Sequence, residues 1–402
     1  MRGPACPILE GMTAQSPAHP SEQPTRSDAA SQPADETFTA ASAVELARVR
    51  RSGFVETRHL GAAVVTGPDG RRLITLGDVE APIFPRSTLK PFQTVAAMNC
   101  GAMLGGEQIA IASGSHRAND DQVAAVRSIL ADAELDESAL RCPSVGRRHA
   151  GEADSALFYN CSGKHAAFLA ACAASGWDTD TYLDPGHPLQ QEVLRVIAEI
   201  TGEQPSVVGV DGCGAPLAAI SLAGLGRAYA RLGAAARNIR AEARLATVST
   251  AMLDYPEFVE APGRSNTVIM EELDVIAKLG AEGVLGLGTP SGYSVAVKTL
   301  DGSSRANALV GLNLLIAVGA VDEHRAAAVI AQATPRVTGG DAVVGRFELA
   351  PAVAELVREH GREPVQPDGP TAPAAGAPAA GVPSAGDASP RGRGAGSDED
   401  RP

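Results

Sequence analysis

Segments typical of β-strands lie near both ends of the central part of this chain, and segments typical of helices fill the interval between them. Residues 59–66 and 73–77 flank a Pro-Asp-Gly turn, which predicts a hairpin. Residues 283–288 and 292–299 predict a second pair of strands. Between about 90 and 253 the apolar residues recur with helical spacing. This order predicts an α/β (α+β) fold in which both ends of the core build one antiparallel sheet, with helices between and around it.

The two ends of the 402-residue chain differ in composition from the part between them. Residues 1–40 and 363–402 are rich in small residues and proline, and such segments bury too little apolar surface to offset the entropy of an ordered chain. We therefore expect two disordered tails and one domain over residues 41–362. At the start of that domain, residues 42–50 predict a short helix.

Net charge, hydropathy and cysteine content indicate which classes of partner and which cellular compartment to expect. A net charge of −13 argues against nucleic acid as the main partner. The longest apolar run, residues 308–321, is shorter than the ~20 residues that cross a bilayer, and it contains Asn313, so it predicts a buried helix and no membrane association. The six cysteines are scattered, and no export signal is recognised near the N-terminus, so we expect free thiols and a cytoplasmic protein.

Ser87 and Lys90 form a Ser-x-x-Lys motif at the start of a predicted helix. Residues three apart are neighbours on one helix face, so the motif sets a hydroxyl beside an amine. A serine hydroxyl needs an adjacent base to act as a nucleophile, and a lysine is that base only when its pKa is lowered. The alternative interpretation is a capping serine and a solvated lysine.

Ser115 and Lys298 are candidates for a second pair of this kind. Ser115 ends a short apolar segment, where it would otherwise be a helix N-cap. Lys298 lies on a predicted strand, where it would otherwise point to solvent. An early Ser-x-x-Lys and a late strand lysine followed by threonine also resemble the boxes of serine β-lactamases and penicillin-binding proteins, although two residues, Leu300 and Asp301, separate Thr299 from Gly302 here.

Cysteine, lysine and histidine residues suggest a metal site. Two thiolates with a nitrogen ligand suit zinc. Spacing favours Cys161, His165 and Cys213, because Lys164 must lose its proton to bind a metal. The alternative is that both cysteines are small buried apolar residues. Asp211 either orients an amine or amide or caps its turn.

These motifs occur in an order that resembles the asparaginase II family, the rhizobial-type L-asparaginases, over about residues 45–350. The matching segments are RSTLKPFQ at 86–93, ASGSH at 112–116, NCSGKH at 160–165, DGCGAP at 211–216, YPE at 255–257, GRSNT at 263–267, AEGV at 281–284 and VKTLDG at 297–302.

The resemblance implies a fold similar to serine β-lactamases and glutaminases, hydrolysis of L-asparagine to aspartate and ammonia, and a homodimer. The catalytic pairs that it implies are Ser87/Lys90 and Ser115/Lys298. The zinc ligands that it implies are Cys161, Lys164 and Cys213, in place of the set with His165. The substrate-pocket residues that it implies are Arg86 and Asp211.

In the expected reaction Ser87 attacks the side-chain amide, Lys90 takes its proton, and Ser115 and Lys298 relay protons. Two segments depart from the usual family pattern and are expected to bear on substrate preference: residues 117–120, and Asn266 where an aspartate is usual. The alternatives are a β-lactamase-like serine acylase or peptidase, and a non-catalytic protein that senses asparagine or zinc.

Overall fold

The computed structural model describes residues 36–146, 151 and 153–367, all of which belong to one compact unit. The predicted tails lie outside the described residues, apart from residues 36–40 and 363–367.

An antiparallel sheet forms the centre of the structure, and its strands come from both ends of the described chain. The strand order is β11-β12-β1-β2-β10-β9-β8, and β3 pairs with β2 outside this path. The strands are β1 (Val44–Arg51), β2 (Phe54–Thr66), β3 (Arg72–Leu76), β8 (Ile276–Gly280), β9 (Val284–Gly288), β10 (Ser294–Thr299), β11 (Val337–Gly339) and β12 (Ala342–Leu349). The predicted fold class is therefore confirmed: early β2 and late β10 pair directly, with Ala62 opposite Lys298.

The helix predicted over residues 42–50 is wrong, because that segment is strand β1. Strand β1 pairs with β2 on one side and with β12 on the other. Pairing on both sides satisfies its backbone groups and outweighs a weak local preference for helix.

Two helices cover opposite faces of the sheet. Helix α6 (Leu222–Ala235) packs where Gly286 and Gly288 leave room, since a methyl group on Gly286 would meet the Tyr229 ring at 2.4 Å. Helix α10 (Asn307–Ala317) packs on Leu285 and Leu287, which alternate with those glycines and so point to the other face. As predicted, the apolar run is a buried helix. In the part of the chain that the structure describes, no helix is long and apolar enough to cross a membrane.

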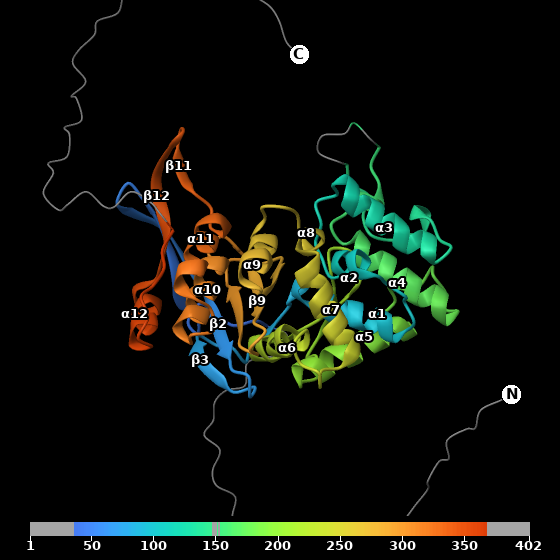
Figure 1. Ribbon diagram of the computed structural model, residues 1–402, viewed down its shortest axis with the longest axis horizontal. Coiled ribbons are helices and arrows are strands. Elements are labelled where there is room, and N and C mark those ends of the chain that lie inside the picture. Colours follow the sequence, from blue (N-terminus) through green and yellow to red (C-terminus); the bar gives the residue numbers. More distant parts are fainter. Residues whose placement is uncertain (1–35, 147–150, 152, 368–402) are drawn as a thin grey trace, which may run out of the picture. The chain divides into compact units, whose positions relative to one another are not determined.

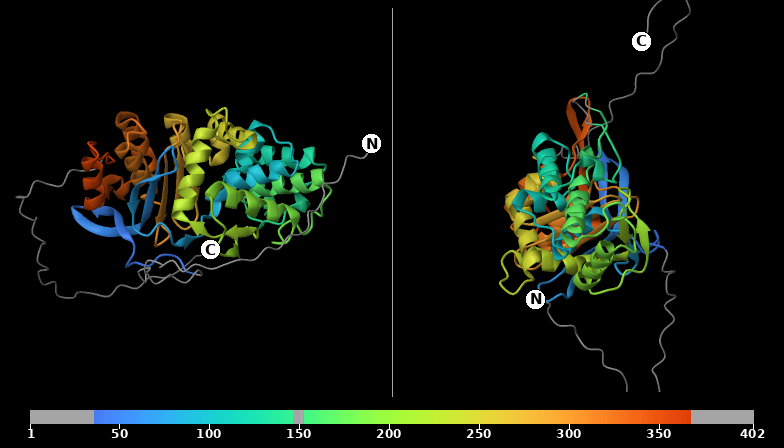
Figure 2. Two further views of the ribbon diagram at one scale, coloured as in Figure 1. Left: turned by 90° about the horizontal axis from the view of Figure 1, so that it is seen from below. Right: turned by 90° about the vertical axis from the view of Figure 1, so that its right-hand side faces the viewer.

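The other helices, together with α10, gather in two groups, as Figure 1 and the left view of Figure 2 show. The first group, cyan to yellow-green, contains α1 (Lys90–Asn99), α2 (Gly106–Ala112), α3 (Asp120–Asp132), α4 (Ser162–Ser175), α5 (Pro188–Thr201) and α7 (Ala243–Asp254). The second, orange to red, contains α10, α11 (Glu323–Ala333) and α12 (Pro351–Glu359). Short α8 (Pro256–Val259) and α9 (Ser265–Leu273) lie between the groups, and α9 packs on edge strand β8. The junction of the first helical group with strand β8 holds the candidate site.

Candidate active site

Ser87 lies in a single 3-10 turn, η1 (Arg86–Leu89), that leads directly into α1. The turn rests on strand β8, because a methyl group on Gly280 would meet the carbonyl oxygen of Pro85 at 2.5 Å. The Tyr229 hydroxyl of α6 donates to the carbonyl oxygen of Thr88 at 2.8 Å. Arg86, just before the serine, has a φ of +55°, a conformation that non-glycine residues hold only when their surroundings impose it. The sheet edge therefore sets where Ser87 stands.

Replacement of Gly280 by alanine should consequently disturb this turn. We expect Gly280→Ala to lower the free energy of unfolding by roughly 1–3 kcal/mol and to reduce activity, because the added methyl group overlaps the Pro85 carbonyl. Urea denaturation and an activity assay would measure both. Gly186→Ala is the matched control, since a methyl group there meets nothing within 4 Å. Equal effects of the two substitutions would contradict this account.

Arg86 and Asp211, predicted as substrate-pocket residues, are in contact although 125 positions apart. The guanidinium Nε of Arg86 donates to Asp211 Oδ1 at 2.7 Å. Burial by itself would raise the pKa of Asp211, but the positive charges of Lys164 and Arg86 lower it. Asp211 is therefore a carboxylate at neutral pH, with one charged partner already in place.

Ser115 Oγ lies between two lysine amines. Lys90 Nζ and Lys278 Nζ each donate to it at 3.0 Å. Lys90 also donates to the carbonyl oxygens of Gly114 and Asn160, and Lys278 donates to that of Leu279 at 2.6 Å. The two amines thus converge on one hydroxyl.

The predicted pair of Ser115 with Lys298 does not form, and Lys278 takes that place. Lys298 Nζ donates instead to the carbonyl oxygens of Glu282 and Thr299. Lys298 lies on β10, which is flanked by β2 and β9, whereas Lys278 lies on β8, the edge strand that packs on η1. Lys278 was missed, although a lone lysine within an apolar strand (Val275-Ile-Ala-Lys-Leu279) was a signal that could have found it.

The chain has four lysines in all, and every one is buried: Lys90, Lys164, Lys278 and Lys298. Burial, together with the positive charge of Lys90, lowers the pKa of Lys278 to about 7. Burial also lowers the pKa of Lys90, against the opposing charge of Cys161. A neutral amine that accepts a proton is therefore accessible near neutral pH.

The Ser87 hydroxyl makes no hydrogen bond with this cluster. Among the hydrogen bonds of residues 36–146 and 153–367, none involves Ser87 Oγ. The expected contact with Lys90 is thus not a hydrogen bond here, because the amine turns to Ser115.

The predicted zinc residues Cys161, Lys164 and Cys213 are brought together and buried. Lys164 Nζ donates to Cys213 Sγ at 3.1 Å, and a hydrogen bond with Cys213 holds the pKa of Cys161 well below its usual value. His165 instead pairs its Nδ1 with the Tyr182 hydroxyl at 2.7 Å. No group of three or more His, Cys, Asp or Glu side chains in the described ranges is placed to hold a metal ion. Two thiols and an amine nevertheless converge, and such donors fit zinc once deprotonated.

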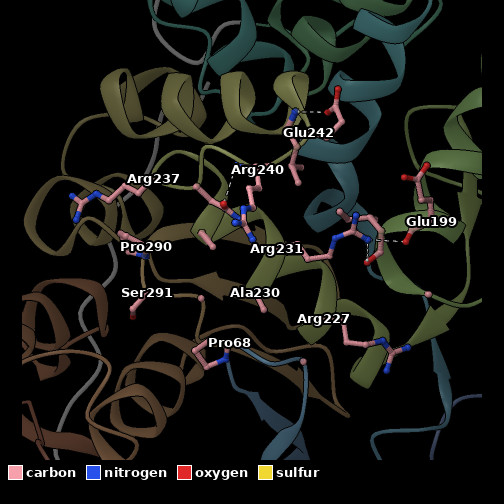
Figure 3. Close-up of a pocket in the computed structure, with 18 of the residues that line it drawn as sticks. Pro68, Glu199, Arg227, Ala230, Arg231, Arg237, Arg240, Glu242, Pro290 and Ser291 are labelled. Carbon is pink, nitrogen blue, oxygen red and sulfur yellow. Dashed lines mark hydrogen bonds between the residues drawn. The ribbon is translucent and has the colours of Figure 1, made fainter.

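A cavity of about 720 Å³ lies elsewhere, between α6, α7 and the loops at Pro68 and Pro290 (Figure 3). None of the site residues described above lines it. Several of its arginines are already hydrogen-bonded within the protein. Arg231, for example, donates to the Glu199 carbonyl oxygen at 2.8 Å. This cavity is therefore separate from the lysine cluster.

Comparison with known proteins identifies the family of this chain. The family model described as L-asparaginase II matches residues 47–349. A comparison with curated proteins finds no match. Among solved structures, the chain is similar to "Mglu in its glutamate form" (12% identity, TM-score 0.38, 65% of this chain and 61% of that one) and to "Mglu" (13%, 0.39, 65% and 67%). It is also similar to a β-lactamase from Mycobacterium bovis (17%, 0.30, 60% and 88%). The chain thus spans less than two thirds of the first of these, and at such TM-scores the structural similarities carry no argument.

Proposed function

Because the chain belongs to the L-asparaginase II family and is on that ground an asparaginase-type amidohydrolase, we propose that it hydrolyses L-asparagine to L-aspartate and ammonia. The observation that carries the proposal is the Ser115 hydroxyl between the amines of Lys90 and Lys278, beside the turn that presents Ser87. A serine nucleophile requires an adjacent base, and a buried lysine with a lowered pKa can serve as one.

In the proposed reaction, Ser87 Oγ attacks the side-chain amide carbon and its proton passes to neutral Lys90. The new ester bond forms as the C–N bond breaks, and ammonia leaves with a proton returned from the lysine cluster. Water then hydrolyses the β-aspartyl ester, which releases aspartate and restores Ser87. Ser115 and Lys278 exchange protons with Lys90 through the two 3.0 Å hydrogen bonds. The cluster can therefore accept and return a proton both when the ester forms and when water hydrolyses it.

Arg86 and Asp211 would hold the substrate's amino-acid end. Arg86 suits the α-carboxylate and Asp211 the α-ammonium group, because each places a charge opposite to its ligand. Their own ion pair at 2.7 Å keeps both charged before substrate arrives. This assignment rests on the proposed substrate.

Zinc is part of the proposal, with Cys161, Lys164 and Cys213 as its ligands. Bound there, it would supply a fixed positive charge that orders the two loops and the substrate. Lys164 would bind as the neutral amine, which the cation itself favours.

Removal of the metal tests that part. We expect incubation with 1,10-phenanthroline to lower kcat/KM by about tenfold or more, and added zinc to restore it. A non-chelating isomer, 1,7-phenanthroline, is the control. Full activity in protein that elemental analysis finds free of zinc would exclude the metal from the function.

Ammonia release from L-asparagine by the purified chain tests the activity itself, with L-glutamine and the β-lactam nitrocefin in parallel. Release from asparagine supports the proposal, and turnover of nitrocefin alone would favour a β-lactamase-like acylase. Tight binding of asparagine without release would favour a sensor. The expected homodimer and cytoplasmic location stay predictions.

A further inference from the structure

The two segments that depart from the family pattern meet at one buried carboxylate. Glu260 is 6% exposed and follows α8. Its Oε1 accepts from Arg117 Nη2 at 2.7 Å, and its Oε2 accepts from the backbone N–H of Asn266 at 3.2 Å. A buried carboxylate is costly unless it is paired and hydrogen-bonded, and Glu260 has both kinds of partner.

On one side Val259, the residue before Glu260, contacts the backbone of Ser115. The Ser115 N–H donates to the Val259 carbonyl oxygen at 2.7 Å. Glycine at 114 lets the chains approach, since a methyl group there would meet the Phe258 carbonyl oxygen at 2.6 Å. The Gln122 side chain donates to the Glu260 carbonyl oxygen at 2.8 Å and accepts from the Arg117 N–H at 2.9 Å.

On the other side Glu260 is linked to the Lys278 strand through Asn266. The Asn266 side-chain oxygen accepts from the N–H of Leu279 at 2.9 Å. Leu279 follows Lys278, whose Nζ lies 3.0 Å from Ser115 Oγ. The contacts therefore form a closed ring that passes from Ser115 through Glu260 and Asn266 to Lys278 and back to Ser115.

We propose that Glu260 is a positioning residue for the Ser115–Lys278 pair, and that Arg117 limits how strongly the Glu260 charge acts on the Lys278 amine. The inference rests on the proposed function and deepens it, because it assigns control of basicity to residues that touch neither substrate nor nucleophile.

The charges that act most strongly on Lys278 are those of Lys90, Glu260, Cys161 and Arg117. The other elements packed on β8 contribute little. Strand β9 has no titratable side chain, the charged side chains of α7 and α9 are exposed, and the Arg86 guanidinium of η1 is paired with Asp211. In α6, Arg231 is exposed, Arg227 is paired with Glu203, and the buried Tyr229 hydroxyl donates to the Thr88 carbonyl oxygen. Substitutions at Glu260 and Arg117 therefore change the field at this amine selectively.

The signs of the two effects are opposite. Burial and Lys90 lower the pKa of Lys278, Glu260 raises it, and Arg117 lowers it. Glu260→Gln should thus lower the pKa of Lys278 further, whereas Arg117→Ala should raise it. Mere loosening of the structure would admit water and raise the pKa in both variants. Opposite shifts consequently separate control of charge from a purely structural role.

Because the chain has only four lysines, the pKa of Lys278 can be measured directly by NMR. In protein labelled with 13C-lysine, four side chains give signals, and Lys278→Met identifies one of them. We expect the pH at the midpoint of the Lys278 titration to fall by about half a pH unit or more in Glu260→Gln. It should rise by a similar amount in Arg117→Ala. Arg117→Lys should restore the wild-type value.

The matched control is Arg127→Ala, which removes an exposed arginine paired with Glu137 on the same helical group and should leave the titration unchanged. The acid limb of the kcat/KM profile should follow the titration in each variant. Shifts in the same direction, or none, would overturn the inference. If Glu260→Gln does not fold, the comparison of Arg117→Ala with Arg117→Lys decides, because the lysine variant keeps the positive charge at a side chain that is 54% exposed. Equal pKa values of Lys278 in these two variants would then overturn the inference. Wild-type protein without ammonia release would overturn the proposed function, while the titration would still decide the inference.

Discussion

Ser87→Ala is expected to lower ammonia release by about four orders of magnitude or more, because loss of a serine nucleophile removes the covalent route altogether. The substitution should leave the fold intact, since Ser87 Oγ makes no hydrogen bond to the described residues. Initial rates from a coupled ammonia assay, together with thermal unfolding, would measure both quantities. Loss of activity at an unchanged Tm is the expected pair of results.

Ser115→Ala is the informative comparison. We expect a smaller loss, roughly 10²–10³-fold, because this hydroxyl links two amines and does not attack the substrate. Ser128→Ala, whose hydroxyl bonds to the Ala125 carbonyl oxygen at 2.8 Å on an unrelated helix, is the control and should retain activity. The reverse order, with Ser87→Ala active and Ser115→Ala inactive, would make Ser115 the nucleophile and overturn the assignment.

Lys278→Met is expected to lower kcat by about a thousandfold, and Lys298→Met by far less. The first substitution removes one of the two amines that hold Ser115 Oγ, and a positioned proton-transfer group contributes about 10²–10⁴-fold. The second removes hydrogen bonds to two backbone carbonyl oxygens, at a cost of about 1 kcal/mol of stability for each one. Steady-state kinetics and urea denaturation of both variants would separate the two kinds of effect.

The two lysines are a matched pair, since both are buried on strands of one sheet. Methionine has a similar length and no charge, so it fills either site without a buried cation. A Lys298→Met variant as inactive as Lys278→Met, at unchanged stability, would restore Lys298 as the second catalytic lysine and contradict the role read from the contacts.

Local signals were enough to predict several features correctly. The hairpin at residues 59–77 and the late strands follow from turn residues and alternating apolar positions, which act over a few residues. The contact of Arg86 with Asp211 and the convergence of Cys161, Lys164 and Cys213 were anticipated from the family's motif order. Their chemical roles stay predictions.

Features that depend on distant partners were not accessible in this way. Residues 44–51 form a strand because β2 and β12 pair with them from both sides, and β12 lies about 300 positions further along the chain. Glu260 gave no signal, because its partners are Arg117, in the loop before α3, and Asn266, in the first turn of α9, which only packing brings together.

The choice between Lys278 and Lys298 as the partner of Ser115 shows most clearly what sequence determined and what tertiary structure decided. Residue types and their order determined that serines, lysines and a sheet with strands from both ends would form the core of this protein. The order of strands in that sheet decided which lysine reaches Ser115: β8 forms the edge beside η1, and β10 lies two strands further in. Both segments are short, apolar and strand-like, and sheet order arises from contacts over the whole chain, so nothing local to either lysine distinguishes them.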